Sequence, residues 1–155
     1  MATVKPIPDG YEMITPYLSV HDGNAAIEFY KNAFDAREVM RMPGEDGMGV
    51  GHADLLLFGR MHLMLADEHP KIGFRGPRTL GGSPVLLHVY VEDVDAVVEK
   101  AVAAGAKLVR PVADQFYGDR AGGIEDPFGH QWYFATQQEI ISEEEMAKRA
   151  QEAKG

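Results

Sequence analysis

Tyrosine and histidine side chains recur along several short segments of the chain, in positions suited to recognising a small organic molecule. Five of them lie in strand-like stretches: Tyr17, His52, His88, Tyr90 and Tyr133. Such side chains combine an apolar body with a polar tip, which suits a partly hydrated pocket with few orienting groups. A histidine near pH 7 can also donate, accept or transfer a proton. These five residues are the candidate ligand-binding residues.

The segments around these residues alternate between apolar and polar positions, which is typical of β-strands with one buried face. One set of positions is almost wholly apolar: Pro16, Leu18, Val20, Leu63, Leu65, Leu87, Val89, Val91, Trp132 and Phe134. The opposite set is mixed: Thr15, Tyr17, Ser19, His52, Asp54, Leu56, His62, Met64, Leu86, His88, Tyr90, Gln131 and Tyr133. We expect the apolar face to pack against helices and the mixed face to line a pocket. A core lined by hydrogen-bonded tyrosines and histidines is the alternative.

Two amphipathic segments supply the helices that the apolar face requires. HDGNAAIEFYKNAFDARE follows the strand that ends at Val20, and EDVDAVVEKAVAAGAKLVRP follows the strand that ends at Val91. Both segments carry apolar residues at helical spacing. Asp22 or Asn24 is the expected N-cap of the first helix, and Gly105 is expected to end the second.

The second half of the chain repeats the order of the first. Phe58 and Phe128, each followed by glycine, lie 70 positions apart, as do Ala36 and Ala106. The pattern of each half predicts a strand, a helix and three more strands. The predicted strands of the first half are at 15–20, 38–42, 51–58 and 61–66, and those of the second half are at 85–91, 107–112, 118–125 and 130–136. This repeat indicates a duplicated half-domain of the α+β class. We predict one domain over residues 1–137, made of modules 15–68 and 84–137 and a linker at 69–83, followed by a C-terminal surface helix at 138–155.

Composition narrows the class of protein. The 155 residues include no cysteine, which excludes disulfides and thiolate metal sites and fits a reducing cytoplasm. The net charge of −9 disfavours a nucleic-acid partner, because phosphate recognition uses clustered Lys and Arg. The sequence contains no apolar run long enough for a membrane span, and its N-terminus lacks the apolar core of a signal peptide. We therefore expect a cytoplasmic protein with no membrane partner.

Other ionisable residues have ordinary structural interpretations. The guanidinium of Arg120 can bind an anionic ligand or hold its own loop through Asp126 or Glu125. Glu125 and Asp126 point to opposite faces of a strand, so this pair is interpreted as structural. His69 lies in the Gly/Pro-rich linker and is assigned to solvent.

The duplicated pattern resembles a known superfamily. LSVHDGNAAIEFYKNAF, VYVEDVDAVVEKAVAAGA and EDPFGHQWYF look like segments of vicinal oxygen chelate proteins, which include glyoxalase I, bleomycin-resistance proteins and extradiol dioxygenases. GHADLLLFG, MLADE, LGGSPV, QFYGDRAG and ISEEEMAKR resemble its PhnB-like branch. The resemblance implies two paired βαβββ modules whose curved mixed sheets carry helices on their outer faces and enclose a ligand cleft. It also implies a homodimer, because open sheet edges need cover.

The same resemblance makes an expectation about metal. Glyoxalase-type members hold a divalent ion with one side chain from the first and last strand of each module. In this sequence those positions are Thr15, Met64, Leu86 and Tyr133. None is His, Asp or Glu, so no metal cofactor is predicted. A Zn, Ni or Fe site built from shifted ligands on the same face is the alternative, with His52, Asp54, His62 and His88 as its candidates.

Three functions stay open from the sequence. The first is a glyoxalase/bleomycin-resistance-like protein that binds a small organic ligand in the sheet cleft without the usual metal. The second is a lyase, isomerase or dioxygenase that uses shifted metal ligands, or His88 and Tyr133 as acid and base. The third is a scaffold whose pocket is incidental. The sequence identifies no catalytic residue and does not name the ligand.

Overall fold

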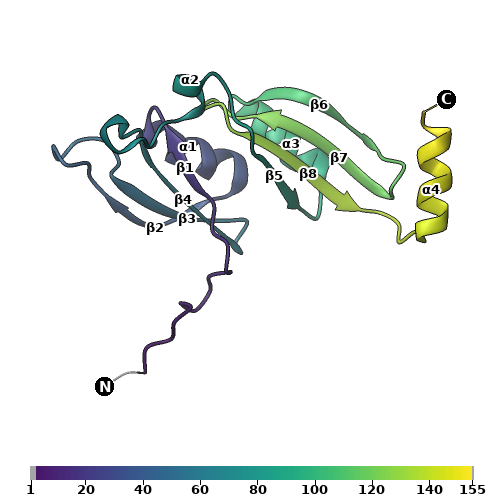
Figure 1. Cartoon of the computed structure of the whole chain (residues 1–155), viewed down its shortest axis with the longest axis horizontal. Helices are drawn as coiled ribbons and strands as arrows, with labels where there is room; N and C mark the ends of the chain where they lie inside the picture. Colours follow the sequence, from purple (N-terminus) through teal and green to yellow (C-terminus); the bar gives the residue numbers. More distant parts are fainter. Residues whose placement is uncertain (1–2, 155) are drawn as a thin grey trace. The chain divides into compact units, whose positions relative to one another are not determined.

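The computed structural model describes residues 3–154, which form two compact units. The first unit ends at Ser83 and the second begins at Pro84. Each unit contains a four-stranded mixed sheet that stays open and one helix packed on it (Figure 1). The predicted α+β class with two βαβββ repeats is confirmed. Residues 1, 2 and 155 of the predicted ranges lie outside the described part of the chain.

The first unit follows the predicted order of elements. It comprises β1 (Tyr17–Val20), α1 (Gly23–Phe34), β2 (Arg37–Met42), β3 (His52–Leu57) and β4 (Met61–Asp67). The sheet order is β1-β4-β3-β2, with β1 parallel to β4 and the other neighbours antiparallel. The linker segment is structured: it contains the short 3-10 helix η1 (Pro70–Ile72) and α2 (Pro77–Leu80).

The second unit repeats this topology. It comprises β5 (Leu86–Tyr90), α3 (Val94–Ala103), β6 (Lys107–Asp114), β7 (Asp119–Glu125) and β8 (Gln131–Gln137). The sheet order is β5-β8-β7-β6, and β5 is parallel to β8. The surface helix α4 (Glu143–Glu152) follows; no described residue of it is buried. No helix within residues 3–154 is both long and apolar enough to cross a membrane.

The first helix begins at one of its two predicted N-caps, and the second begins at an equivalent aspartate. The Asp22 carboxylate accepts a hydrogen bond from the backbone N–H of Ala25 at 2.9 Å, and Asp93 caps α3 in the same way through Ala96 at 3.0 Å. Such a cap satisfies one of the free N–H groups of the first turn. Gly105 follows the end of α3 with a φ of +117°, which L-amino acids rarely adopt.

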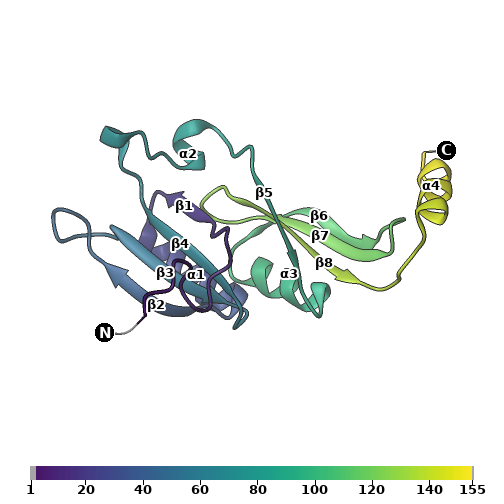
Figure 2. The same cartoon turned by 60° about the horizontal axis from the view of Figure 1, so that its bottom comes forward.

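The alternating pattern correctly separates the two faces of each sheet. Buried apolar side chains of the first sheet face α1: Leu18, Val20, Leu55, Leu57, Leu63 and Leu65. In the second unit Ile124, Trp132 and Phe134 are buried on the side of α3, which lies along one face of its sheet in Figure 2. We call the opposite surface of each sheet its helix-free face. It carries the mixed residues that could bind a ligand.

A buried carboxylate organises the hairpin between β7 and β8. Asp126 accepts hydrogen bonds from the backbone N–H groups of Phe128 and His130, and from Nε1 of Trp132. The structural interpretation of Asp126 is therefore confirmed. The predicted partners of Arg120 were wrong, because its guanidinium pairs with Asp95 of α3 and with Asp114 of β6.

Candidate functional site

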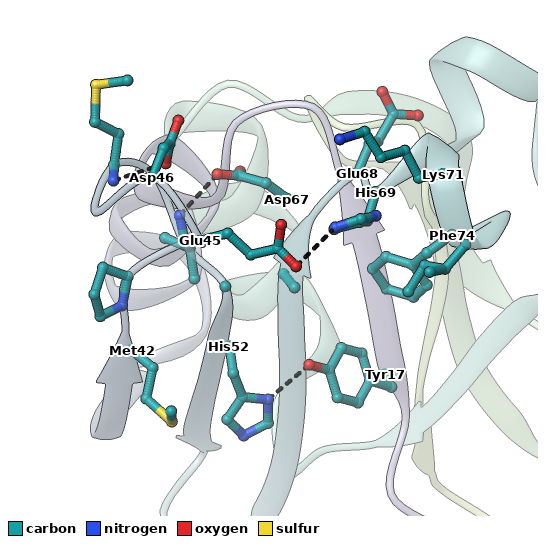
Figure 3. Close-up of a pocket in the computed structure, with 18 residues that line it drawn as sticks. Tyr17, Met42, Glu45, Asp46, His52, Asp67, Glu68, His69, Lys71 and Phe74 are labelled. Atoms are coloured by element: carbon teal, nitrogen blue, oxygen red, sulfur yellow. Dashed lines mark hydrogen bonds and ion pairs between the residues drawn. The ribbon is translucent and has the colours of Figure 1, made fainter.

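A large pocket lies in the first unit, where the sheet meets the loop between β2 and β3 (Figure 3). Its volume is about 1020 Å³. The lining comes from the ends of β1 to β4, from loop residues 43–51 and from residues 68–74. Two of the predicted ligand-binding residues, Tyr17 and His52, line this pocket.

Tyr17 and His52 form a hydrogen-bonded pair at the floor of the pocket. The phenol oxygen lies 2.6 Å from Nδ1 of the imidazole, and Figure 3 shows the two side chains pointing toward each other. Burial raises the pKa of Tyr17, so its hydroxyl stays protonated at neutral pH and can donate to Nδ1. The edge of the Phe74 ring packs against Tyr17 at a centroid distance of 5.6 Å. Tyr17 and Phe74 therefore form an aromatic surface in the pocket, and the imidazole of His52 lies beside it.

The carboxylate of Asp67 holds the pocket loop in place. One oxygen accepts the backbone N–H of Val50 at 2.7 Å, and the other accepts that of Gly23 at the start of α1 at 2.5 Å. Gly49 has a φ of +61°, and a Cβ atom there would lie 2.2 Å from the carboxylate. Only glycine fits this close approach between loop and strand. Asp67 thus fixes one wall of the pocket.

His69 lies at the rim of the same pocket, and its assignment to bulk solvent was wrong. The side chain is 35% exposed, and Nε2 lies 3.6 Å from a carboxylate oxygen of Glu45. Nδ1 is buried and has no hydrogen-bond partner among residues 3–154. A bridge between His69 and Phe74 folds the linker back on itself at η1, which brings the histidine toward the pocket.

The other three predicted residues meet on the helix-free face of the second unit. The His88 ring lies 5.0 Å from the Tyr90 ring and 5.3 Å from the Tyr133 ring, measured between centroids. The Tyr133 hydroxyl is 3.0 Å from that of Tyr117, and the Arg110 guanidinium lies 5.6 Å above the Tyr133 ring. Sequence reasoning missed Tyr117 and Arg110. Arg110 reaches this face through the register of β6 to β8, and Tyr117 lies in the loop between β6 and β7.

Hydrogen bonds adjust the acidity of these phenols. Tyr90 donates to Asp119 at 3.0 Å, and this bond to a carboxylate raises the pKa of the tyrosine. Burial, followed by the contact with Tyr133, raises the pKa of Tyr117 well above its ordinary value. Both groups therefore remain neutral hydroxyls at physiological pH rather than bases, and the single proton of Tyr90 is already donated to Asp119.

Comparison with known proteins identifies the family. A sequence model of the Glyoxalase/Bleomycin resistance protein/Dioxygenase superfamily matches residues 12–134. The chain belongs to this superfamily. An uncharacterised protein of Mycobacterium bovis, Mb0911c, is 46% identical over 122 residues, which cover 77% of this chain and 79% of that protein. The predicted vicinal oxygen chelate resemblance is therefore confirmed.

Solved structures of other proteins share the fold. TioX from Micromonospora sp. ML1 has a TM-score of 0.64 and 26% identity, over 81% of this chain and 98% of its own. A PhnB protein from Bacillus cereus, described as a putative 3-demethylubiquinone-9 3-methyltransferase, has a TM-score of 0.60 and 22% identity, over 81% of this chain and 99% of its own. The PhnB protein supports the fold alone.

At the positions where glyoxalase-type members bind their metal ion, this chain has residues that are poor ligands for a divalent ion. They carry a thioether, an aliphatic chain and two hydroxyl groups, contributed by Thr15, Met64, Leu86 and Tyr133. Of the alternative ligands, Asp54 and His62 lie 2.8 Å apart. Across residues 3–154, no group of three or more His, Cys, Asp or Glu side chains is arranged to hold a metal ion. The donor chemistry therefore does not match that of a divalent metal centre.

The strand register shows how the two helix-free faces of this superfamily member differ. Across the first sheet the paired residues are Tyr17, Met64, Asp54 and Met40. Across the second sheet the corresponding row is His88, Tyr133, Gly123 and Arg110. The third residue of the row is Asp54 in the first unit and Gly123 in the second, where the phenol of Tyr133 lies next to the glycine. The duplication repeats the backbone but not the chemistry.

Proposed function

We propose that this protein binds a small organic molecule on the helix-free faces of its sheets and that binding requires no metal ion. Tyr17 and His52 are the proposed contacts in the first unit, and His88, Tyr90 and Tyr133 those in the second. The observation that carries the proposal is the pocket of about 1020 Å³ beside the Tyr17–His52 pair. Its size is at the upper end of the pockets that hold drug-sized ligands.

The chemistry of the lining indicates the kind of ligand. Tyr17 and Phe74 offer aromatic surface, while His52 offers one polar ring nitrogen beyond the atom bonded to Tyr17. Such a combination favours an aromatic or apolar molecule with a few polar groups. Binding is proposed rather than metal-dependent catalysis because the donors at the glyoxalase positions do not suit a divalent ion. The homodimer and the cytoplasmic location stay predictions.

A thermal-shift screen of a compound library, followed by calorimetric titration of the hits, tests this function. A ligand at about 100 times its dissociation constant adds about 2.7 kcal/mol to stability. We expect His52→Ala to weaken binding of ligands in the first unit by about 1–3 kcal/mol, the cost of a lost polar partner that the ligand buries. His88 is exposed, so His88→Ala should weaken binding in the second unit by a smaller amount.

His21→Ala is the matched control, because His21 is exposed and does not line the pocket. It should leave the affinity of every hit unchanged. A library without a single stabilising compound would count against the proposal. So would hits whose affinity is the same in His52→Ala, His88→Ala and the wild-type protein.

A further inference from the structure

A tyrosine from the N-terminal segment occupies the helix-free face of the first sheet. The Tyr11 ring stacks on His62 with a centroid distance of 3.8 Å and an interplanar angle of 23°. Its hydroxyl donates a hydrogen bond to one oxygen of Asp54, whose other oxygen lies 2.8 Å from Nδ1 of His62. Asp54 is only 1% exposed. The three side chains form a closed arrangement outside the pocket lining.

A turn presents Tyr11 to the sheet. The backbone N–H of Tyr11 donates to the carbonyl of Pro8 at 3.3 Å, and Gly10 takes a φ of +86°, as the third residue of such a turn requires. The residues that follow do not pack on the sheet, since Met13 is 89% exposed and Ile14 is 85% exposed. The side chain of Tyr11 therefore contacts the sheet, while the residues that follow it are exposed to solvent.

Asp54 and His62 supply what recognition of an aromatic hydroxyl group needs. A carboxylate removed from water requires donors, and a phenol offers a strong one. The flat imidazole offers a stacking surface for the ring that bears the hydroxyl. The bond to Asp54 raises the pKa of Tyr11, so the phenol keeps the proton that it donates. Tyr11 thus shows how a phenol fits here.

We infer that Asp54 and His62 form a binding subsite for phenols and that Tyr11 is its displaceable intramolecular occupant. The inference rests on the proposed function, because it names a ligand class for the same sheet face. Asp54 and His52 are two residues apart on β3, so their side chains share this face. A hydroxyaromatic ligand enters the subsite when the Tyr11 segment leaves it.

Displacement sets the expected size of the effect. The apparent dissociation constant equals the intrinsic one divided by the fraction of molecules with a free subsite. Open minor states of this kind hold roughly 0.1–10% of the population. Removing the tyrosine is therefore expected to strengthen the binding of a phenol by about tenfold or more.

The experiment uses p-cresol, which is the side chain of tyrosine, and toluene, which lacks only the hydroxyl. Both are titrated into wild-type protein and Tyr11→Ala while the imidazole signals of His62 are followed by NMR. We expect p-cresol to bind Tyr11→Ala at least about tenfold more tightly than wild type, and toluene to bind Tyr11→Ala more weakly than p-cresol. Tyr11→Phe keeps the ring without the hydroxyl and should give an intermediate affinity.

Asp54→Asn in the Tyr11→Ala background replaces the charged acceptor with a neutral amide oxygen and should reduce the affinity for p-cresol toward that for toluene. If this double variant does not fold, the comparison of p-cresol with toluene and the affinity of Tyr11→Phe still test whether the subsite recognises the hydroxyl group. Equal affinity of p-cresol for wild type and Tyr11→Ala would overturn the inference, as would toluene binding equal to p-cresol. The inference would also be overturned if p-cresol, at concentrations up to about 10 mM, did not shift the imidazole signals of His62 in Tyr11→Ala. Library hits that depend on His52 would leave the proposed function standing in each case.

Discussion

Replacing Asp126 with alanine is expected to destabilise the protein by about 3–5 kcal/mol, the largest loss that we predict for a single polar residue. The carboxylate is 3% exposed and accepts three hydrogen bonds, from the N–H groups of Phe128 and His130 at 2.9 and 3.0 Å and from Trp132 at 2.9 Å. Each buried donor that loses its acceptor costs about 1–3 kcal/mol. The variant also leaves a small void beside the indole.

Urea unfolding of Asp126→Ala, compared with the wild-type protein, measures this loss. Glu125→Ala is the control, because Glu125 is the preceding residue but points to the other face of the strand and is only half-buried. Its effect should stay within about 0.5 kcal/mol. A loss below about 1 kcal/mol for Asp126→Ala would show that the carboxylate does not organise the hairpin between β7 and β8.

Replacing Asp67 with alanine is expected to cost about 2–4 kcal/mol and to loosen the pocket loop. Its two oxygens join Val50 of the loop to Gly23 at the start of α1, so the substitution removes both bonds at once. The amide of Val50 should then exchange with solvent at least about tenfold faster, since local opening needs less free energy. Hydrogen exchange measured by NMR reports this amide directly.

Asp46→Ala separates the loop anchor from general effects of lost charge. Asp46 also lines the pocket, but it is exposed and accepts the nearby N–H of Met48, two residues away. We expect little change in Val50 exchange in this variant. If Asp67→Ala leaves the exchange rate of Val50 unchanged, the carboxylate is not what holds the loop against β4.

The fold could be predicted because its causes are local and are repeated in the sequence. Asp22 marks a helix start through its side-chain hydrogen bond, and Gly105 marks a helix end through its backbone conformation. Alternation along each strand separates the helix-packed residues, such as Leu65 and Phe134, from the mixed face. The offset of about 70 residues then extends the interpretation of one half to the other.

The site was predicted only in part, because its walls depend on contacts between distant segments. Tyr17 and His52 share a face by parity alone, and the structure brings them within hydrogen-bonding distance. The pocket loop depends instead on Asp67, which reaches backbone groups 17 and 44 residues away. His69 gave no periodic signal in a Gly/Pro-rich segment, and the bridge to Phe74 that positions it arises only when the chain folds.

The partner of Arg120 was missed for a related reason. Sequence proximity suggested Glu125 or Asp126, but the guanidinium reaches Asp95, which lies on α3 and is 25 residues away. Tyr11 was not singled out either, because an isolated tyrosine before the first strand carries no pattern. Only the folded chain places it over Asp54 and His62. Long-range pairs of this kind are not readable from a single sequence.

The proposal that this protein binds an organic ligand without a metal ion is tested by the metal dependence of ligand binding. A hit from the library screen is titrated calorimetrically into protein treated exhaustively with EDTA, and again after addition of Zn²⁺, Ni²⁺ or Fe²⁺. We expect one dissociation constant for all of these conditions, because Thr15, Met64, Leu86 and Tyr133 do not supply the ligands of a divalent ion. Binding that disappears with EDTA and returns with a stoichiometric metal ion would contradict it.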